Sequence, residues 1–268
     1  MAYKMLVLDL DGTLTNSKKE ITPVTYAALD RAMEKGVKVV LASGRPTYGI
    51  VPLAKELDLA RKGGYILSFN GGRITDCTTG EVIYERILSA EKAGELYDLA
   101  QLHKVNIMTY QDENIITEKP DDQYVELESR INKMTIKKVE SFKDYVTFPV
   151  NKCLMVEEGD YLGEVEKKVK AAVGDELSVC RSEAFFLEVM PKNIDKAYSL
   201  GKLLEHLGMT REEMICCGDG FNDKSMSEYA GLGVAMQNGK PEVKAAADYI
   251  APSNDEDGIA HVIEKFLL

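Results

Sequence analysis

The chain has 268 residues, of which 45% are hydrophobic and 29% are charged. This composition is typical of a soluble globular protein with one large or two ordinary domains. The formal net charge of -11 argues against sequence-independent nucleic-acid binding, which depends on Lys and Arg neutralising phosphates. No apolar stretch approaches the roughly 20 residues of a membrane span, and none of targeting type precedes Asp9. We therefore expect a cytoplasmic protein with no membrane or nucleic-acid partner, and no protein partner is implied.

The cysteines and histidines show no spacing that is typical of metal ligands. We expect buried, reduced thiols because the cysteines are odd in number, scattered and without CxxC spacing: Cys77, Cys153, Cys180, Cys216 and Cys217. We interpret the histidines, which lie in helical patterns, as structural or facing solvent: His103, His206 and His261.

The two ends of the chain alternate between apolar strands and amphipathic helices. In the first part we expect strands at 4–10, 37–42 and 65–69, with helices at 23–36 and 46–57. In the last part we expect helices at 196–206, 222–230 and 257–268, with strands at 214–217 and 232–235. This alternation predicts an α/β fold, a doubly wound and mainly parallel Rossmann-like core sheet.

The middle of the chain has a different pattern, which begins with the hairpin signal Asn70-Gly71-Gly72. Short strands and helices share about a hundred residues there, as is typical of an α+β domain inserted into the first domain. We expect the core domain to comprise residues 1–83 and 187–268. The inserted domain is expected at 84–186.

The first strand ends in Asp9-Leu10-Asp11-Gly12-Thr13. Carboxylates at the carboxyl end of a strand buried on both faces are costly unless they are paired or bind metal. Open α/β proteins bind their ligands at this edge of the sheet. Asp-Gly is also a common turn signal, so this segment alone is equally consistent with an ordinary strand-to-turn junction.

Three further segments supply complementary groups at strand ends or helix starts. Ser43 and Gly44 follow the second strand, where a hydroxyl and backbone N–H groups can hold a phosphate oxygen. Lys196 lies at a helix start, where a cation is unfavourable unless an anion accompanies it. Asp219 and Asp223 follow the apolar strand 214–217. Each segment alone would be a loop or a surface residue, so the hypothesis depends on their convergence.

Four carboxylates at one sheet edge would repel one another. Two unit charges about 4 Å apart cost about 4 kcal/mol at an effective dielectric of 20. A divalent cation removes that cost, and oxygen ligands favour magnesium over zinc. We therefore expect Mg2+ as cofactor, bound near Asp9, Asp11, Asp219 and Asp223.

The four motifs together resemble those of the haloacid dehalogenase-like hydrolases. They are DLDGT at 9–13, Ser43 after a strand, Lys196, and GDGFND at 218–223. An insertion between Ser43 and Lys196 is similar to the large α+β cap of the Cof-type branch, which includes many sugar-phosphate phosphatases. The chain departs from that branch at Gln237 and Ala197, where glycine is usual.

The resemblance implies covalent catalysis on a phosphate ester. Asp9 would be the nucleophile that attacks phosphorus and becomes an aspartyl-phosphate. Asp11 would be the acid that protonates the leaving alkoxide and the base that activates water. Thr13 would hydrogen-bond the nucleophile or steady its loop.

It also implies how the phosphoryl group and the metal are held. Ser43, Lys196 and Asn222 would bind the phosphoryl oxygens, together with the backbone N–H groups of Leu10 and Gly44. Asp219 would ligate magnesium directly, with Asp9 and the backbone carbonyl of Asp11. Asp223 would act through a water or by orienting Lys196.

We expect a magnesium-dependent phosphatase acting on small phosphate esters, either sugar phosphates or phosphorylated cofactors. A phosphomannomutase-like phosphomutase is the nearest alternative, since it would return the phosphoryl group to substrate instead of water. A non-catalytic phosphometabolite-binding protein is the alternative from another class, although binding alone needs no nucleophile beside an acid. Turns near 70–73, 110–114 and 181–185 are candidate substrate contacts or ordinary turns.

Overall fold

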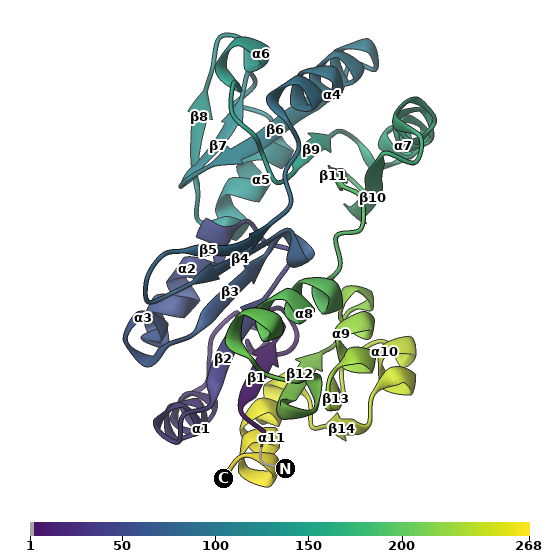
Figure 1. Cartoon of the computed structure of the whole chain (residues 1–268). Coiled ribbons are helices and arrows are strands. Elements are labelled where there is room, and N and C mark those ends of the chain that lie inside the picture. Colours follow the sequence, from purple (N-terminus) through teal and green to yellow (C-terminus); the bar gives the residue numbers. More distant parts are fainter. Residues whose placement is uncertain (1–2) are drawn as a thin grey trace. The chain divides into compact units, whose positions relative to one another are not determined.

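The computed structural model describes residues 3–268, which form two compact units (Figure 1). The first unit contains the chain up to Tyr84 together with Asp195–Leu268, and the second is Glu85–Ile194. The sequence expectation put the second boundary between 186 and 187. That point lies within strand β11 (Phe186–Pro191), which pairs with β9 and β10 of the second unit. The chain therefore returns to the first unit eight residues later than expected, at Asp195.

The first unit is built on an eight-stranded sheet in the order β14-β13-β12-β1-β2-β3-β4-β5. The pairs from β14 to β3 are parallel, and β4 is antiparallel to β3. The strands are β1 (Met5–Leu8), β2 (Lys38–Ala42), β3 (Tyr65–Ser68), β4 (Arg73–Asp76), β5 (Val82–Glu85), β12 (Met214–Gly218), β13 (Leu232–Met236) and β14 (Tyr249–Ala251). The doubly wound, mainly parallel α/β core predicted from the sequence is confirmed.

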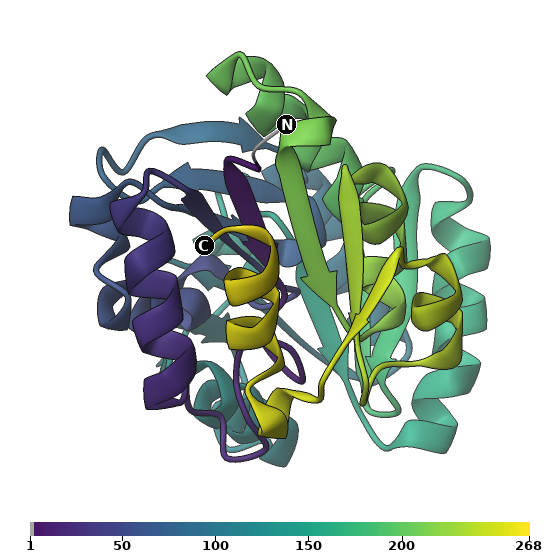
Figure 2. The same ribbon diagram turned by 90° about the horizontal axis from the view of Figure 1, so that it is seen from below.

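Helices cover both faces of this sheet. The helices of the first unit are α1 (Pro23–Glu34), α2 (Thr47–Glu56), α3 (Leu59–Lys62), α8 (Lys196–Leu207), α9 (Lys224–Tyr229), α10 (Pro241–Ala246) and α11 (Gly258–Phe266). Figure 2 shows α1 beside α11, with the strands behind them. Helix α1 begins where the sequence predicts, because the Thr22 hydroxyl accepts a hydrogen bond from Thr25 N and Pro23 occupies the first turn. Its apolar side joins a core that also contains the strand residue Leu41.

The second unit is a six-stranded sheet in the order β10-β11-β9-β6-β7-β8, antiparallel except for the β7–β8 pair. The remaining strands are β6 (Asn106–Gln111), β7 (Asn114–Thr117), β8 (Thr135–Lys138), β9 (Cys153–Val156) and β10 (Leu177–Glu183). Helices α4 (Ala90–Leu102) and α7 (Gly159–Val173) share one core with the sheet. The others are α5 (Gln123–Asn132) and α6 (Phe142–Tyr145).

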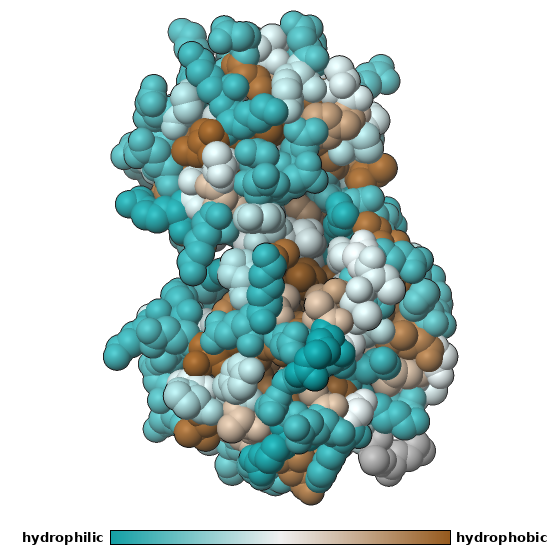
Figure 3. Space-filling view, turned by 90° about the vertical axis from the view of Figure 1, so that its left-hand side faces the viewer, coloured by the Kyte–Doolittle hydropathy of each residue, from teal (hydrophilic) through white to brown (hydrophobic). Residues whose placement is uncertain are grey.

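The surface, the cysteines and the lengths of the helices agree with most of what the sequence predicts. Hydrophilic side chains cover most of the face in Figure 3, with hydrophobic ones scattered among them. All five cysteines are free, but Cys180 is exposed and Cys77 half-buried, so the expectation of buried thiols is wrong for these two. Cys180 lies on β10, and Cys77 follows β4, where it packs only in part against the core of the first unit. No helix within residues 3–268 is long and apolar enough to cross a membrane.

A buried ion pair lies inside the second unit. Lys152 Nζ is 3.0 Å from Glu188 Oε1, and the two side chains are only 3% and 8% exposed. The Tyr110 hydroxyl donates to Glu128 Oε1 at 2.6 Å, and Lys152 Nζ lies 5.4 Å from the Tyr110 ring centroid. Burial by itself lowers the pKa of Lys152, but the carboxylates of Glu188 and Glu128 outweigh it and the pKa is raised. The lysine is therefore a buried cation that depends on its acidic neighbours.

The substitution Glu188→Gln should destabilise the protein by about 3 kcal/mol, because it keeps the shape but leaves a buried charge without its partner. The matched control is Glu176→Gln. Glu176 pairs with Lys92 at 3.2 Å but is 73% exposed, so its loss should cost less than about 1 kcal/mol. Urea denaturation of both variants measures the difference. Equal small losses would show that the buried pair contributes no more than a surface pair.

Candidate active site

Three neighbouring strands of the first unit end in the residues that the sequence singled out. Strand β1 lies between β2 and β12, and all three run parallel, so their carboxyl ends meet at one edge. Asp9 follows β1, Ser43 follows β2 and Asp219 follows β12. Asp9 N donates to Cys217 O at 3.0 Å, which ties the loop after β1 to the end of β12. The order of the strands therefore brings together groups that are up to about 200 residues apart in the chain.

A buried lysine links two of the carboxylates. Lys196 Nζ donates to Asp9 Oδ1 at 2.8 Å, to Asp223 Oδ1 at 2.6 Å and to Ala42 O at 3.1 Å. These three acceptors use all three N–H groups of the ammonium. The lysine is 1% exposed even though it begins helix α8, where its charge opposes the helix dipole. These contacts give Lys196 the anionic neighbours without which a cation at a helix start is unfavourable.

Asp223 orients both the lysine and the loop that carries Asp219. Its second oxygen, Oδ2, accepts hydrogen bonds from Asp219 N at 3.0 Å and Gly220 N at 2.9 Å. Its side chain is 1% exposed. The sequence left two roles open for Asp223, contact with the metal through a water or orientation of Lys196. Because both oxygens have protein donors, Asp223 fits the second role.

Asp219 lies against the glycine turn after β1. Thr13 Oγ1 donates to Asp219 Oδ1 at 3.0 Å. A Cβ atom on Gly12 would lie 2.5 Å from Asp219 Oδ2, and Gly12 has a φ of +86°. Only glycine combines that backbone conformation with so close an approach. The DLDGT turn thus places its threonine and its glycine around the same carboxylate.

The acidic groups raise one another's proton affinity. Burial and then the charge of Asp223 raise the pKa of Asp9 well above its usual range, although Lys196 opposes this. Burial and the charge of Asp223 also raise the pKa of Asp219. For Lys196, burial lowers the pKa, but the charges of Asp223 and Asp9 reverse this and raise it. The single positive charge of Lys196 therefore does not balance the three carboxylates, and an excess of negative charge is left.

A divalent cation fits this donor set. One carboxylate oxygen from each of Asp9, Asp219 and Asp223 lies within 4.8 Å of the other two. Hard oxygen donors with no nearby thiolate or imidazole are those that magnesium prefers. The carboxylate of Asp11, which the sequence also suggested as a ligand, is not part of this cluster. Coordination of the metal by the backbone carbonyl of Asp11 stays a prediction.

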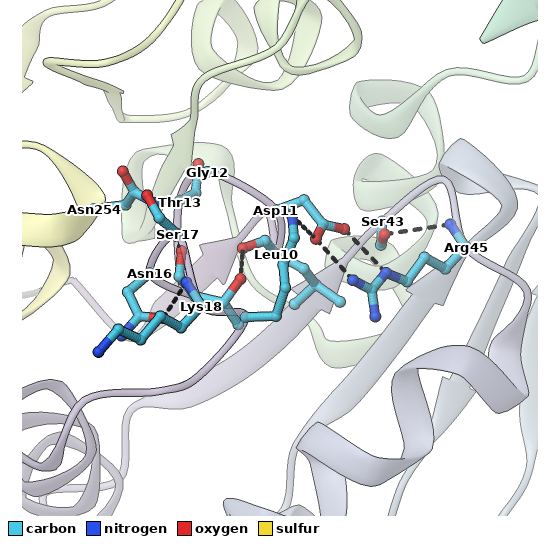
Figure 4. Close-up of polar contacts among 12 residues, drawn as sticks. Leu10, Asp11, Gly12, Thr13, Asn16, Ser17, Lys18, Ser43, Arg45 and Asn254 are labelled. Carbon is cyan, nitrogen blue, oxygen red and sulfur yellow. Dashed lines mark hydrogen bonds and ion pairs between the residues drawn. The ribbon is translucent and has the colours of Figure 1, made fainter. Parts of the chain in front are cut away.

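Asp11 instead pairs with two cations, and Figure 4 shows its contact with one of them, Arg45. Arg45 Nε and Nη2 donate to its two oxygens at 2.9 and 2.7 Å, and Lys19 Nζ lies 2.7 Å from Oδ1. Such a two-pronged arginine contact fixes the carboxylate's orientation as well as its charge. Burial tends to raise the pKa of Asp11, but these two cations prevail and the pKa is lowered. Asp11 is therefore an oriented, ionised carboxylate.

Two backbone N–H groups are free to bind an anion. Within residues 3–268, neither Leu10 N nor Gly44 N donates to a protein acceptor. Leu10 is fully buried, and a buried N–H without a partner is unusual. Ser43 is 4% exposed, and its Oγ accepts a hydrogen bond from Arg45 N at 3.2 Å, which leaves its hydroxyl proton to donate.

Asn222 is exposed, and its Nδ2 donates to Asn70 Oδ1 at 2.9 Å. Sequence reasoning missed the roles of Arg45 and Lys19 in these contacts, and it named Asn70 only as part of a turn that could contact the substrate. Arg45 directly follows Ser43-Gly44, and Asn70 belongs to the hairpin signal after β3, so proximity to a strand end was the available clue. The three histidines take no part, since none belongs to the acidic cluster.

Comparisons with known proteins agree with this geometry. Residues 6–263 match the family description of the haloacid dehalogenase-like hydrolases. The chain belongs to this family. A haloacid dehalogenase-like hydrolase from Bacteroides thetaiotaomicron is 50% identical, with 98% of this chain and 99% of that one covered and a TM-score of 0.95.

Two further matches carry more specific names. A sugar phosphatase of haloacid dehalogenase subclass IIB is 28% identical, with a TM-score of 0.80 and 98% of each chain covered. The 5-amino-6-(5-phospho-D-ribitylamino)uracil phosphatase YcsE of Bacillus subtilis is 30% identical over 99% of this chain and 96% of its own length. The predicted resemblance to the Cof-type branch of haloacid dehalogenase-like hydrolases, and with it a hydrolase of phosphatase type, is confirmed.

The substitution Gly12→Ala should abolish most of the hydrolase activity of this family member. Its Cβ would displace the Asp219 carboxylate, and a misplacement of about 1 Å can cost about 100-fold in rate. The control is Gly36→Ala, since Gly36 has a similar φ of +88° but nothing within 4 Å of a new Cβ. Both should lose about 1–2 kcal/mol of stability to backbone strain. Thermal melts and p-nitrophenyl phosphate hydrolysis test this, and equal activity in the two variants would contradict it.

Proposed function

We propose that this protein is a magnesium-dependent phosphatase that hydrolyses small phosphorylated metabolites through an aspartyl-phosphate on Asp9. The observation that carries the proposal is the bridge of Lys196 between Asp9 and Asp223. It places a cation on the carboxylate that would attack, beside the free N–H groups of Leu10 and Gly44. A site with an anionic nucleophile needs such positive groups to accept a second anion, the phosphate ester.

The first half of the proposed reaction transfers the phosphoryl group to the protein. A carboxylate oxygen of Asp9 forms a bond to phosphorus while the bond from phosphorus to the alcohol oxygen breaks. Lys196, Ser43 and the N–H groups of Leu10 and Gly44 bind the non-bridging oxygens as their charge redistributes. Asp11 gives a proton to the departing alkoxide. Since only a neutral carboxyl can donate, its contacts with Lys19 or Arg45 have to open in this step.

The second half hydrolyses the aspartyl-phosphate. Asp11, now ionised, takes a proton from water, whose oxygen bonds to phosphorus as the bond to Asp9 Oδ breaks. Arg45 and Lys19 favour the ionised form of Asp11 and hold it in place for this half. Mg2+, bound near Asp9, Asp219 and Asp223, would supply charge neutralisation that lets an ionised Asp9 meet an anionic substrate.

Sugar phosphates and phosphorylated cofactors are the proposed substrates. The similarity to a subclass IIB sugar phosphatase supports sugar phosphates, and the similarity to the 5-amino-6-(5-phospho-D-ribitylamino)uracil phosphatase YcsE supports small phosphate esters of other kinds. Both are small polar phosphate monoesters, which agrees with the expectation of a small-molecule partner.

Phosphate release from a panel of sugar phosphates, flavin mononucleotide, pyridoxal phosphate and p-nitrophenyl phosphate tests the proposal. Wild type should release phosphate, and Asp9→Asn should reduce the rate by at least about 1,000-fold because a carboxamide is a poor nucleophile. Asp160→Asn is the control, since Asp160 is exposed at the start of α7. Transfer to a second sugar without free phosphate would indicate a phosphomutase. Binding of these esters without turnover would indicate a binding protein.

The cation site predicts opposite effects of Asp219→Asn with and without magnesium. Without the metal the variant should melt higher than wild type, because the burial of a charge and the repulsion from Asp223, which together raise the pKa of Asp219, are both removed. With Mg2+ at 100 times its dissociation constant, wild type should gain about 2.7 kcal/mol and the variant much less. Thermal melts across a magnesium series, with EDTA as zero, measure this. A wild-type melting temperature that does not respond to magnesium would contradict it.

A further inference from the structure

We propose that Asn70 is a further substrate-binding residue, whose side-chain amide donates a hydrogen bond to the phosphoryl group. This inference rests on the proposed function. Its starting observation is a loop with an unusual backbone. Phe69, Asn70 and Gly71 have successive positive φ values of 53°, 57° and 100°. Left-handed conformations are unfavourable for residues other than glycine, and in a bulky residue such as Phe69 they mark local strain.

The strained loop is pinned to the segment that follows β2. Phe69 N donates to Arg45 O and Asn70 N to Ser43 O, both at 3.0 Å. Two backbone hydrogen bonds thus join the Asn70 loop to the residues proposed to bind phosphate. The position of Asn70 is fixed relative to Ser43 and does not depend on its own side chain.

On its other side the loop presses against the start of helix α8. A Cβ atom on Gly71 would lie 2.6 Å from Asp195 O and 2.6 Å from Ser199 Oγ. Asp195 directly precedes Lys196, the residue that bridges Asp9 and Asp223. The loop is therefore held between two of the segments that supply the phosphoryl-binding groups, which explains why a left-handed phenylalanine is tolerated there.

The Asn70 side chain connects two members of that binding set. Its Oδ1 accepts from Asn222 Nδ2 at 2.9 Å. Its carboxamide also lies flat against Gly44, since a Cβ there would be 3.0 Å from Nδ2, 3.1 Å from Oδ1 and 3.3 Å from Cγ. Any larger residue at position 44 would push the carboxamide away.

The amide nitrogen of Asn70 is left with unused donors. Its oxygen is engaged by Asn222, and within residues 3–268 no protein acceptor lies within hydrogen-bond distance of its Nδ2. Nδ2 lies beside Gly44, whose backbone N–H also has no protein acceptor. Adjacent free N–H donors from a loop and a side chain form an anion-binding arrangement. Asn222 then acts on the phosphoryl group partly through Asn70, as a positioning residue.

Asn70→Gly separates this role from a structural one. Glycine adopts a left-handed φ without strain, so the variant should keep or gain stability while it loses the donor. Losing a hydrogen bond to a charged group should weaken binding of inorganic phosphate by about 10- to 100-fold. Asn70→Asp keeps the shape but offers a carboxylate to an anion, so it should weaken phosphate binding at least as much.

The matched control is Lys104→Gly, which changes another residue with a left-handed φ, of 54°, at an exposed position in the second unit. It should leave phosphate binding unchanged. Calorimetric titration of inorganic phosphate in the presence of Mg2+ measures binding without requiring turnover. Melting temperatures and the KM and kcat for p-nitrophenyl phosphate complete the comparison.

A phosphate affinity within two-fold of wild type in Asn70→Gly and Asn70→Asp would overturn the inference. A lowered melting temperature with unchanged phosphate affinity would assign Asn70 a purely structural role and also overturn it. Weakened phosphate binding at normal stability supports it. These outcomes differ from failure of the proposed function, which would appear as a wild-type protein that releases no phosphate and is unaffected by Asp9→Asn.

Discussion

The ion bridge centred on Lys196 is the interaction on which the site depends. A buried ammonium has to be paired, because taking a charge out of water costs several kcal/mol even after relaxation. Here Asp9, Asp223 and the Ala42 carbonyl satisfy it completely. Asp9 follows β1, Asp223 lies beyond the end of β12, and Ala42 is the last residue of β2. One side chain therefore fixes the relative positions of three strand ends.

The same bridge explains why the acidic residues occupy different roles. Both carboxylate oxygens of Asp223 accept hydrogen bonds from protein donors. Of the two oxygens of Asp9, Oδ1 accepts the hydrogen bond from Lys196. Within residues 3–268, the Asp219 carboxylate accepts a hydrogen bond only from Thr13. Asp9 and Asp219 therefore keep free lone pairs that can bind a cation or attack phosphorus, whereas Asp223 orients Lys196 and the loop of Asp219. Three similar carboxylates thus differ in chemistry because their partners differ.

The strand ends that carry the site could be predicted because apolar runs buried on both faces are evident in the sequence. The predicted ranges of β1, β2 and β12 agree with the structure to within two residues. Small elements such as β8 and α10 were missed, since β8 is mostly exposed and α10 is only six residues long. Their existence depends on neighbours rather than on their own pattern.

Side-chain partners were harder to predict than positions. Arg45 follows directly from the Ser43 loop, yet nothing in its spacing shows that its guanidinium turns towards Asp11 instead of solvent. The sequence around Asn70 predicts only a turn, because Asn-Gly is a general hairpin signal and occurs in turns that have no function. Its left-handed backbone and its contact with Gly44 appear only when β2 and β3 lie side by side.

The central position of β1 also constrains the order in which the protein can fold. One of the two partners of β1, strand β12, is synthesised more than 200 residues after β1 itself. Until then the β1 edge that faces β12 has no strand to pair with, whereas the whole of Glu85–Ile194 is contiguous and can complete its own sheet. During synthesis the inserted unit is therefore able to finish first, and the earlier segment is the one that stays exposed to non-native strand pairing and to chaperones.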